Sequence, residues 1–182
     1  MNSLIKFDTE HLLIRDLSLK DVGSIHELHS QPETDRYNTL GIPESIEHTT
    51  ALVAEWLIDQ QSKQRSSYIF ALELKESSEF LGLIALKMGR INYKSAEVWY
   101  KLKQMHWSKG HATEAVKRLL GFAFNDLKLH RVEAGCDVDN LASARVLEKA
   151  GLQREGRKRK VLPIRGDWKD NFIYGILEED FL

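Results

Sequence analysis

Hydrophobic and polar positions change their spacing several times along the 182-residue chain, and each change marks an element. A short apolar run at 12–14 predicts a first strand. Apolar residues then recur at helical spacing after Asp21 and again after Ser45, which predicts two helices. The stretch 31–41 between them is polar and contains a proline and a glycine, so we expect a loop there.

Apolar runs of strand length follow these two helices. Their ranges are 68–74, 80–88, 95–102 and 131–138. An amphipathic pattern over 110–126 predicts a helix between the third and the fourth run. A second helix is expected over 140–150, ending at Gly151, where a C-terminal cap glycine would stand. Two further runs, 152–161 and 168–177, predict a closing hairpin.

This order of elements mixes hairpins with crossover helices. It predicts an α/β (α+β) fold with a mixed sheet and helices on its faces, and one domain over residues 1–182. No internal repeat, linker or low-complexity tract divides the chain. The glycine patterns of dinucleotide-binding folds and phosphate loops are absent, which argues against a doubly wound nucleotide fold.

Composition and charge exclude several classes of protein. The net charge of −1 argues against nucleic-acid binding through bulk positive charge, so we interpret the basic residues between 154 and 165 as a solvated face. The single cysteine, Cys136, excludes an internal disulfide framework and a cysteine zinc cluster, and we expect a packed thiol and no metal centre. Neither a signal peptide nor a membrane span is evident, so the cytoplasm is the expected location.

The first chemical signal lies where the run 95–102 leads into the helix at 110–126. A helix start has backbone N–H groups without partners, and its dipole favours anions. Gly110 and Ala112 would let a diphosphate approach this backbone closely, and Lys109 would add a positive charge. Any loop-to-helix junction might show such a pattern, so this motif alone is weak.

A second signal opens the helix at 140–150. Asn140 suits the N-cap position, which is a purely structural role. Its amide is also placed to bond an amide-rich ligand beyond the helix end. Ser143 lies one turn further along the same face.

Four blocks of the chain resemble the GNAT superfamily of N-acetyltransferases, and within it the ribosomal-protein N-terminal (alanine/serine) acetyltransferases. The blocks are Thr9–Arg15, Trp107–Ala115, Asn140-x-x-Ser143 with Glu148-Lys149-x-Gly151, and Gly166-x-Trp168-x-Asp170 leading to Tyr174. The resemblance covers residues 9–181 in the right order and spacing. It implies a GNAT fold, with a splayed, mostly antiparallel sheet of six to seven strands flanked by about four helices. It also implies acetyl-CoA as co-substrate and a primary amine as acceptor.

The resemblance further implies where acetyl-CoA binds. The strands 95–102 and 131–138 part, and the pantetheine arm lies between them, paired with one strand edge. The diphosphate takes the N–H groups that open the helix after residue 107, and Asn140 and Ser143 face the arm from the other side. The implied binding residues are Tyr100, Leu102, Trp107, Ser108, Lys109, Gly110, His111, Ala112, Thr113, Asn140, Ser143 and Lys149.

Catalysis by direct transfer needs a base for the amine and a partner for the leaving thiolate. Our hypothesis for the base is Glu97, although a solvated strand carboxylate is an equal reading. Many GNAT enzymes carry a tyrosine where this chain has Leu147. Ser143 is then the candidate for bonding the thiolate, and positioning the cofactor is an equally good role for it. Tyr174 is a more distant candidate and fits the core better.

The acceptor stays open at this stage. Enzymes of the resembling branch act on protein N-termini, polyamines, aminoglycosides and small amines, and the resemblance suggests a homodimer. We expect residues 31–64 to line the acceptor side. Acids that could attract a cationic amine, or be ordinary surface charges, are Glu33, Asp35, Glu44 and Glu47. A catalytically silent CoA-binding domain is the competing interpretation, because the usual tyrosine is missing.

Overall fold

Eight strands form one mixed sheet in the computed structural model, which describes residues 4–181. The strands are β1 (Lys6–Asp8), β2 (Leu12–Asp16), β3 (Ser67–Leu74), β4 (Phe80–Met88), β5 (Ser95–Leu102), β6 (Arg131–Asp137), β7 (Gln153–Ile164) and β8 (Asp167–Leu177). Their order across the sheet is β1-β2-β3-β4-β5-β6-β8-β7. Only β5 and β6 run parallel, and every other neighbouring pair is antiparallel.

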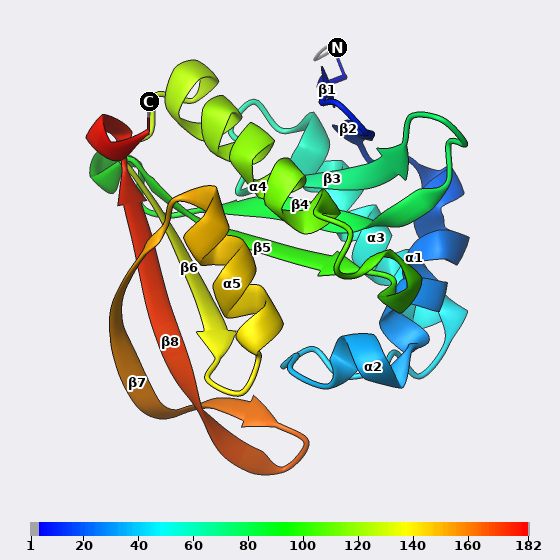
Figure 1. The fold of residues 1–182 in the computed structure, drawn as a ribbon. Coiled ribbons are helices and arrows are strands. Elements are labelled where there is room, and N and C mark those ends of the chain that lie inside the picture. The colour runs from blue at the N-terminus through cyan, green and yellow to red at the C-terminus, as the bar shows by residue number, and fades with distance from the viewer. Residues whose placement is uncertain (1–3, 182) are drawn as a thin grey trace.

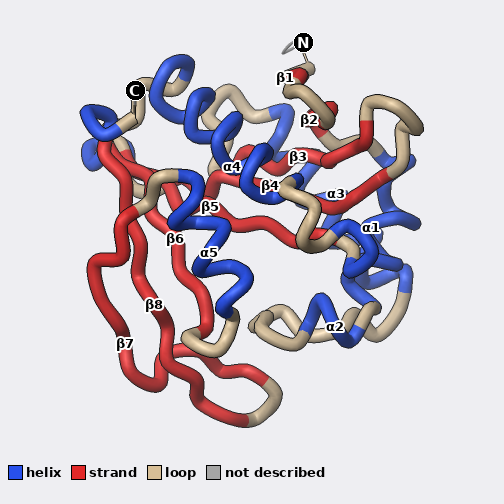
Figure 2. Tube along the Cα trace, in the orientation of Figure 1, coloured by secondary structure: helices blue, strands red, loops and turns tan. Residues whose placement is uncertain are grey.

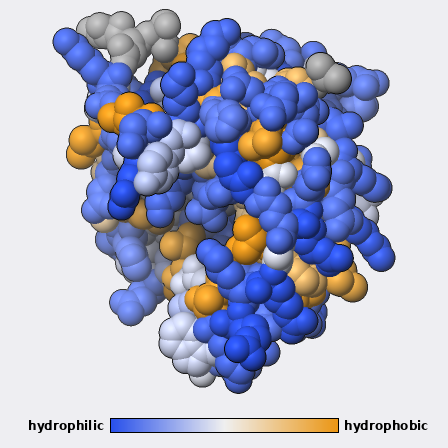
Figure 3. Space-filling view, turned by 90° about the vertical axis from the view of Figure 1, so that its left-hand side faces the viewer, coloured by the Kyte–Doolittle hydropathy of each residue, from blue (hydrophilic) through white to orange (hydrophobic). Residues whose placement is uncertain are grey.

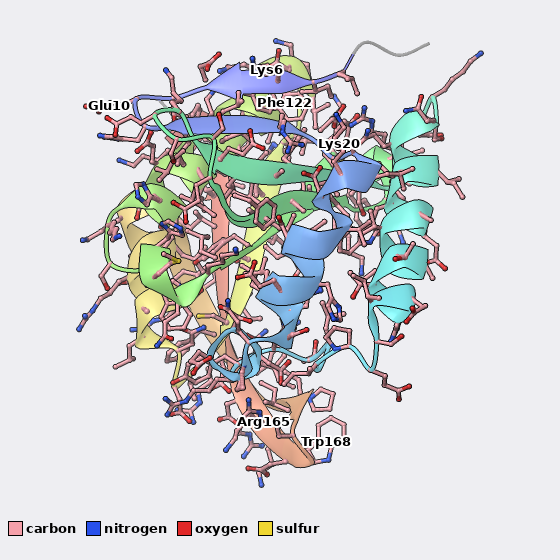
Figure 4. All side chains as sticks on the ribbon, turned by 90° about the vertical axis from the view of Figure 1, so that its right-hand side faces the viewer. Lys6, Glu10, Lys20, Phe122, Arg165 and Trp168 are labelled. Atoms are coloured by element: carbon pink, nitrogen blue, oxygen red, sulfur yellow. The ribbon has the colours of Figure 1, made fainter. Side chains whose placement is uncertain are left out.

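Helices cover both faces of this sheet (Figure 1). They are α1 (Val22–Ser30), α2 (Pro32–Asp35), α3 (Ile46–Gln61), α4 (His111–Gly121) and α5 (Leu141–Ala150). A π-helical turn over Phe122–Asp126 continues α4. Seen from the side, the sheet separates α4 and α5 from α1 and α3 (Figure 4). None of the helices in the described part of the chain has the length and apolar character needed to cross a membrane.

The predicted α/β class and mixed, mostly antiparallel sheet are confirmed, and two details of the prediction are wrong. The sheet has eight strands instead of six to seven, because β1 was missed: it has three residues, and only Phe7 is buried. Five helices form instead of four, because the predicted loop 31–41 contains α2. This single turn begins at Pro32, whose fixed φ suits the first position of a helix.

Alternation along β5 determines which residues face which side of the sheet. Ala96, Val98 and Leu102 belong to the core shared with α4 and α5. Trp99 packs instead with the smaller core beneath α1 and α3. By the same alternation, Glu97 and Lys101 lie on the α1–α3 face, opposite the side of α4 and α5.

The β5 and β6 strands part as predicted. Their parallel pairing is limited to Ser95–Glu97 with Arg131–Glu133, and beyond it the two strands diverge (Figures 1 and 2). The pairing that remains on each strand is to the outer neighbour, β4 for β5 and β8 for β6. Residues 98–102 and 134–137 therefore present backbone groups without a strand partner to the gap between them.

Candidate active site

The α4 helix begins in an unusual backbone conformation. Gly110 is its N-cap, with a left-handed φ of 88°, and no side chain caps the helix. Ser108, two residues earlier, also has a positive φ of 59°. Left-handed residues at a helix start turn successive N–H groups to one side, which makes a concave site for anions. A Cβ added at Gly110 would meet no atom within 4 Å, so space beside this backbone is open.

Trp107 ties this turn to the end of β5. Its indole N–H donates a hydrogen bond of 2.8 Å to the carbonyl oxygen of Leu102. The segment 107–113 thus begins beside the end of the free edge of β5. Trp107 and Leu102, both predicted to bind the cofactor, are therefore in direct contact.

The α5 helix begins on the other side of the gap. Asn140 is its N-cap, and its Oδ1 accepts a hydrogen bond of 3.1 Å from the backbone N–H of Ser143. The structural role that we expected for Asn140 is therefore present. Ser143 Oγ lies 2.8 Å from the hydroxyl of Tyr100 on β5. Burial raises the pKa of Tyr100, so its hydroxyl keeps its proton near neutral pH.

The other positions considered for the proton donor lie in the core. At the position where many GNAT enzymes have a tyrosine, this chain has Leu147, which is 1% exposed and cannot donate a proton. Tyr174 is fully buried, as expected, and donates a hydrogen bond of 3.1 Å to Glu148 Oε1. Burial, together with this contact, raises the pKa of Tyr174 to about 12. Cys136 is a packed thiol, and burial raises its pKa to about 11. This leaves the hydroxyls of Tyr100 and Ser143, which contact each other beside the gap, as the candidate proton donors.

Glu97 lies at the closed end of the β5–β6 pair. It is exposed and stands beside Lys87 on β4 and Glu133 on β6 in the strand register. These three residues line a shallow hollow of about 180 Å³. Glu97 is three residues before Tyr100, roughly 10 Å along the strand, and faces the opposite side of the sheet. The structure thus separates this predicted base from the Tyr100–Ser143 pair.

Two further predicted binding residues, Lys149 and His111, lie within α5 and α4 respectively. Lys149 is exposed in the last turn of α5, six residues after Ser143, which corresponds to about 9 Å along the helix axis. His111 opens α4 and is partly buried, with its ring centroid 6.3 Å from those of His11 and His106. Burial lowers the pKa of His111, which favours a neutral ring.

Sequence reasoning missed a cluster on the opposite face of β5. Lys101 is 8% exposed, and its Nζ has no hydrogen-bond partner among residues 4–181. His29 and Asp35 are each 4% exposed and also carry an unpartnered buried atom, Nε2 and Oδ1 respectively. The sequence feature that could have revealed this cluster is Lys101 itself, which lies between two hydrophobic residues of a predicted strand. A lysine in a strand ordinarily indicates a solvent-exposed face, so the feature was not recognised.

The basic residues of 154–160 lie on β7, the outer strand of the sheet, and Arg165 lies in the turn after it. They are exposed, as predicted, on a largely hydrophilic side of the molecule (Figure 3). Arg157 pairs with Asp170 Oδ2 at 2.6 Å, and Arg165 reaches Asp35 Oδ2 at 3.6 Å. Local acids therefore neutralise part of this strand.

These features define a class of protein. A parallel strand pair that parts beside a helix start suited to a diphosphate, with two hydroxyls across the gap, fits a transferase that uses a CoA thioester. The open space at Gly110 suits the diphosphate of such a co-substrate, and the free edges of β5 and β6 suit the amides of its pantetheine arm.

Comparisons with known proteins agree with this class and narrow it. A family model described as acetyltransferase (GNAT) domain matches residues 11–153. YnaD of Bacillus subtilis, described as an uncharacterized N-acetyltransferase, is 30% identical over 178 residues, covering 95% of this chain and 97% of that protein. The [ribosomal protein uS5]-alanine N-acetyltransferase of Escherichia coli is 24% identical over 126 residues, 69% of this chain and 65% of that protein.

A solved structure shares the fold. Spermidine N-acetyltransferase from Vibrio cholerae, in complex with CoA and spermine, superposes with a TM-score of 0.85 and 24% identity, covering 95% of this chain and 99% of that one. This chain belongs to the GNAT acetyltransferase family. It is an N-acetyltransferase, an enzyme of the kind that takes its acetyl group from acetyl-CoA.

Proposed function

We propose that this protein transfers the acetyl group of acetyl-CoA to a primary amine, with the N-terminal amine of a protein as its acceptor. The observation that carries the proposal is the Tyr100–Ser143 contact across the gap, beside the helix start at Gly110. It supplies hydroxyl groups on the side of the gap that the predicted cofactor residues line. Acetyl-CoA, when bound, supplies an acetyl group activated as a thioester.

The residues of the chain divide the work of holding this co-substrate. The N–H groups of the first turn of α4 would bind the diphosphate, because they lack intrahelical partners and carry the positive end of the helix dipole. The free edge of β5 from Tyr100 to Leu102 would pair with the amides of the pantetheine arm. Lys109 and Lys149, both exposed, would add positive charge at the outer ends.

Proton transfer divides between the two faces of the sheet. On the α5 side, Ser143 would bond the sulfur of the leaving group while Tyr100 holds the serine hydroxyl in place. On the α1–α3 side, Glu97 would take the proton of the acceptor ammonium, with water bridging the distance. Holding both reactants in one geometry supplies much of the acceleration.

The choice of acceptor rests on likeness and on charge. The blocks in the sequence resemble the protein N-terminal branch, to which the E. coli relative corresponds by name. The V. cholerae structure holds a polyamine, so a polyamine is the second candidate. Exposed acids on α2, on α3 and in the segment between them favour this alternative, namely Glu33, Glu47 and Glu44. Lys101 and Arg165 on the same side disfavour it.

A thiol-release assay tests the proposal. Acetyl-CoA is incubated with a tetrapeptide that has a free N-terminus, with the same peptide N-acetylated, and with spermidine. We expect CoA release with the free peptide alone. CoA release with spermidine alone would mean that the acceptor is a polyamine and not a protein N-terminus. Binding of acetyl-CoA with no CoA release for any of the amines would favour a catalytically silent CoA-binding domain.

A further inference from the structure

Three buried polar atoms without hydrogen-bond partners belong to residues of α1, α2 and β5. They are His29 Nε2, Asp35 Oδ1 and Lys101 Nζ, contributed by three different elements. Half of the unpartnered buried side-chain atoms in residues 4–181 belong to this cluster. Buried polar groups in native proteins are nearly always bonded to protein or to water, so these three atoms are available to a polar ligand.

The positions of these residues are tied to the gap. Lys101 is the residue before Leu102, at the part of β5 that has left β6. Its side chain lies on the α1–α3 face, the side opposite the helix starts of α4 and α5. The charge of Lys101 lowers the pKa of His29, and the charge of Asp35 raises the pKa of Lys101, so Lys101 lies within electrostatic range of both residues.

Charge indicates what this site takes. Burial, followed by the repulsion from Lys101, lowers the pKa of His29 to about 4, so this ring is neutral. Burial lowers the pKa of Lys101 to about 8 while Asp35 opposes the fall, so most of the lysine is charged at pH 7. Arg165 pairs with Asp35 at 3.6 Å. Two cations therefore face one carboxylate, and one positive charge is left uncompensated.

We propose that Lys101, lined by His29 and Asp35, binds a carboxylate carried by the amine acceptor. A carboxylate supplies the oxygen acceptors that the ammonium of Lys101 lacks and balances the extra charge. Asp35 keeps the lysine charged in its buried position. The inference rests on the proposed function and narrows it to amines that carry a carboxylate close to the reacting group.

A contact of Arg165 joins the turn after β7 to α2 beside Asp35. Arg165, in the turn between β7 and β8, donates a hydrogen bond of 3.0 Å to the carbonyl oxygen of Pro32 and reaches Asp35. Arg165 stands at the hairpin tip in Figure 4, and its side chain is about half exposed. Exposed ion pairs contribute little to stability, so the hairpin tip and α2 separate at small cost.

The carboxylate has two sources, and two matched pairs of probes separate them. The first pair is Ala-Asp-Ala-Ala amide and Ala-Asn-Ala-Ala amide, assayed by CoA release. The second pair is N-acetyl-L-alanine and N-acetyl-L-alaninamide, whose binding is measured by calorimetry in the presence of CoA. We expect the wild-type protein to prefer the acidic member by at least tenfold in one pair: the first for a side-chain carboxylate, the second for a main-chain one.

Lys101→Met removes the charge at nearly constant volume. We expect the preference to fall below threefold while the protein stays folded, because Lys101 Nζ has no hydrogen bond to lose and methionine removes a buried charge. Lys6→Met, at an exposed position of β1 on the edge of the sheet opposite β7, keeps the wild-type preference. If Lys101→Met does not fold, the wild-type ratios decide alone.

Two outcomes overturn the inference: equal use of both members in both pairs, or an unchanged preference in Lys101→Met. Failure of the proposed function looks different. In that case no amine releases CoA at all, although the calorimetric pair still reports on Lys101.

Discussion

The hydroxyl of Tyr100 and Ser143 Oγ lie 2.8 Å apart, and this contact joins the free edge of β5 to the first turn of α5. The tyrosine expected in α5 is replaced by the buried Leu147. Tyr100, which belongs to β5 on the opposite side of the gap, therefore places a hydroxyl beside α5, whose own residue 147 has none. Because burial raises the pKa of Tyr100, the pair is a neutral donor chain.

Ser143→Ala separates the two roles left open for this serine. If Ser143 bonds the leaving thiolate, kcat falls by roughly 10- to 100-fold, the scale of a lost transition-state hydrogen bond, while KM for acetyl-CoA changes little. If it only positions the cofactor, KM rises and kcat is kept. Steady-state kinetics at saturating amine distinguishes these results, and we expect the first.

Tyr100→Phe tests whether the tyrosine acts through the serine. We expect a smaller loss of kcat than in Ser143→Ala and no added loss in the double variant, because coupled residues are not additive. The variant also loses one buried hydrogen bond, about 1 kcal/mol of stability. Additive losses in the double variant would mean that Tyr100 acts on its own.

Glu97→Gln tests the predicted base. We expect kcat/KM to fall by about 100-fold and the acidic limb of its pH profile to flatten, since the amide cannot take a proton. Glu133→Gln is the matched control: it is the parallel neighbour of Glu97 on β6 and equally exposed. Full activity of Glu97→Gln across the pH range would show that Glu97 is an ordinary surface carboxylate.

Gly110→Ala probes the helix start where the diphosphate is expected. Its φ of 88° strains any side chain, by about 1–2 kcal/mol, although no protein atom lies within 4 Å of the added Cβ. Gly41→Ala is the control for strain, because Gly41 has a φ of 75° and equally open surroundings. We expect at least tenfold weaker acetyl-CoA binding by calorimetry for Gly110→Ala and unchanged binding for Gly41→Ala. Equal losses in both variants would attribute the effect to backbone strain.

The sequence predicted those parts of the molecule that depend on local pattern. The β4 and β5 strands have the predicted bounds, because long apolar runs with buried faces leave a clear period. Gly110 and Asn140 stand at the predicted helix starts, because capping depends on a few neighbouring residues. The roles assigned there to the cofactor stay predictions.

The acceptor side could not be predicted in this way. Lys101 lies far from His29 and Asp35 in the sequence, and only the tertiary fold brings it within electrostatic range of them. Asp35 was interpreted as one of several acids able to attract a cation. In the structure Asp35 is buried and already pairs with Arg165, so it is not a free surface acid for a cationic amine. Both its burial and this pairing follow from tertiary contacts, which the sequence pattern does not show.

His29 makes stability depend on acid. Its pKa is about 4 in the folded protein, against 6.5 for an ordinary histidine, because of burial and the neighbouring Lys101 and His26. The unfolded chain binds the proton more readily, so this contribution is complete above pH 6.5 and is lost as the pH falls toward 4. The loss amounts to roughly 3 kcal/mol.

His29→Phe stays neutral at every pH, and we expect a shallower fall of the unfolding free energy between pH 6.5 and 4. Urea unfolding over this range measures it, with the exposed His48→Gln as control; parallel curves for His29→Phe and the wild type would show that the buried ring does not control the acid response.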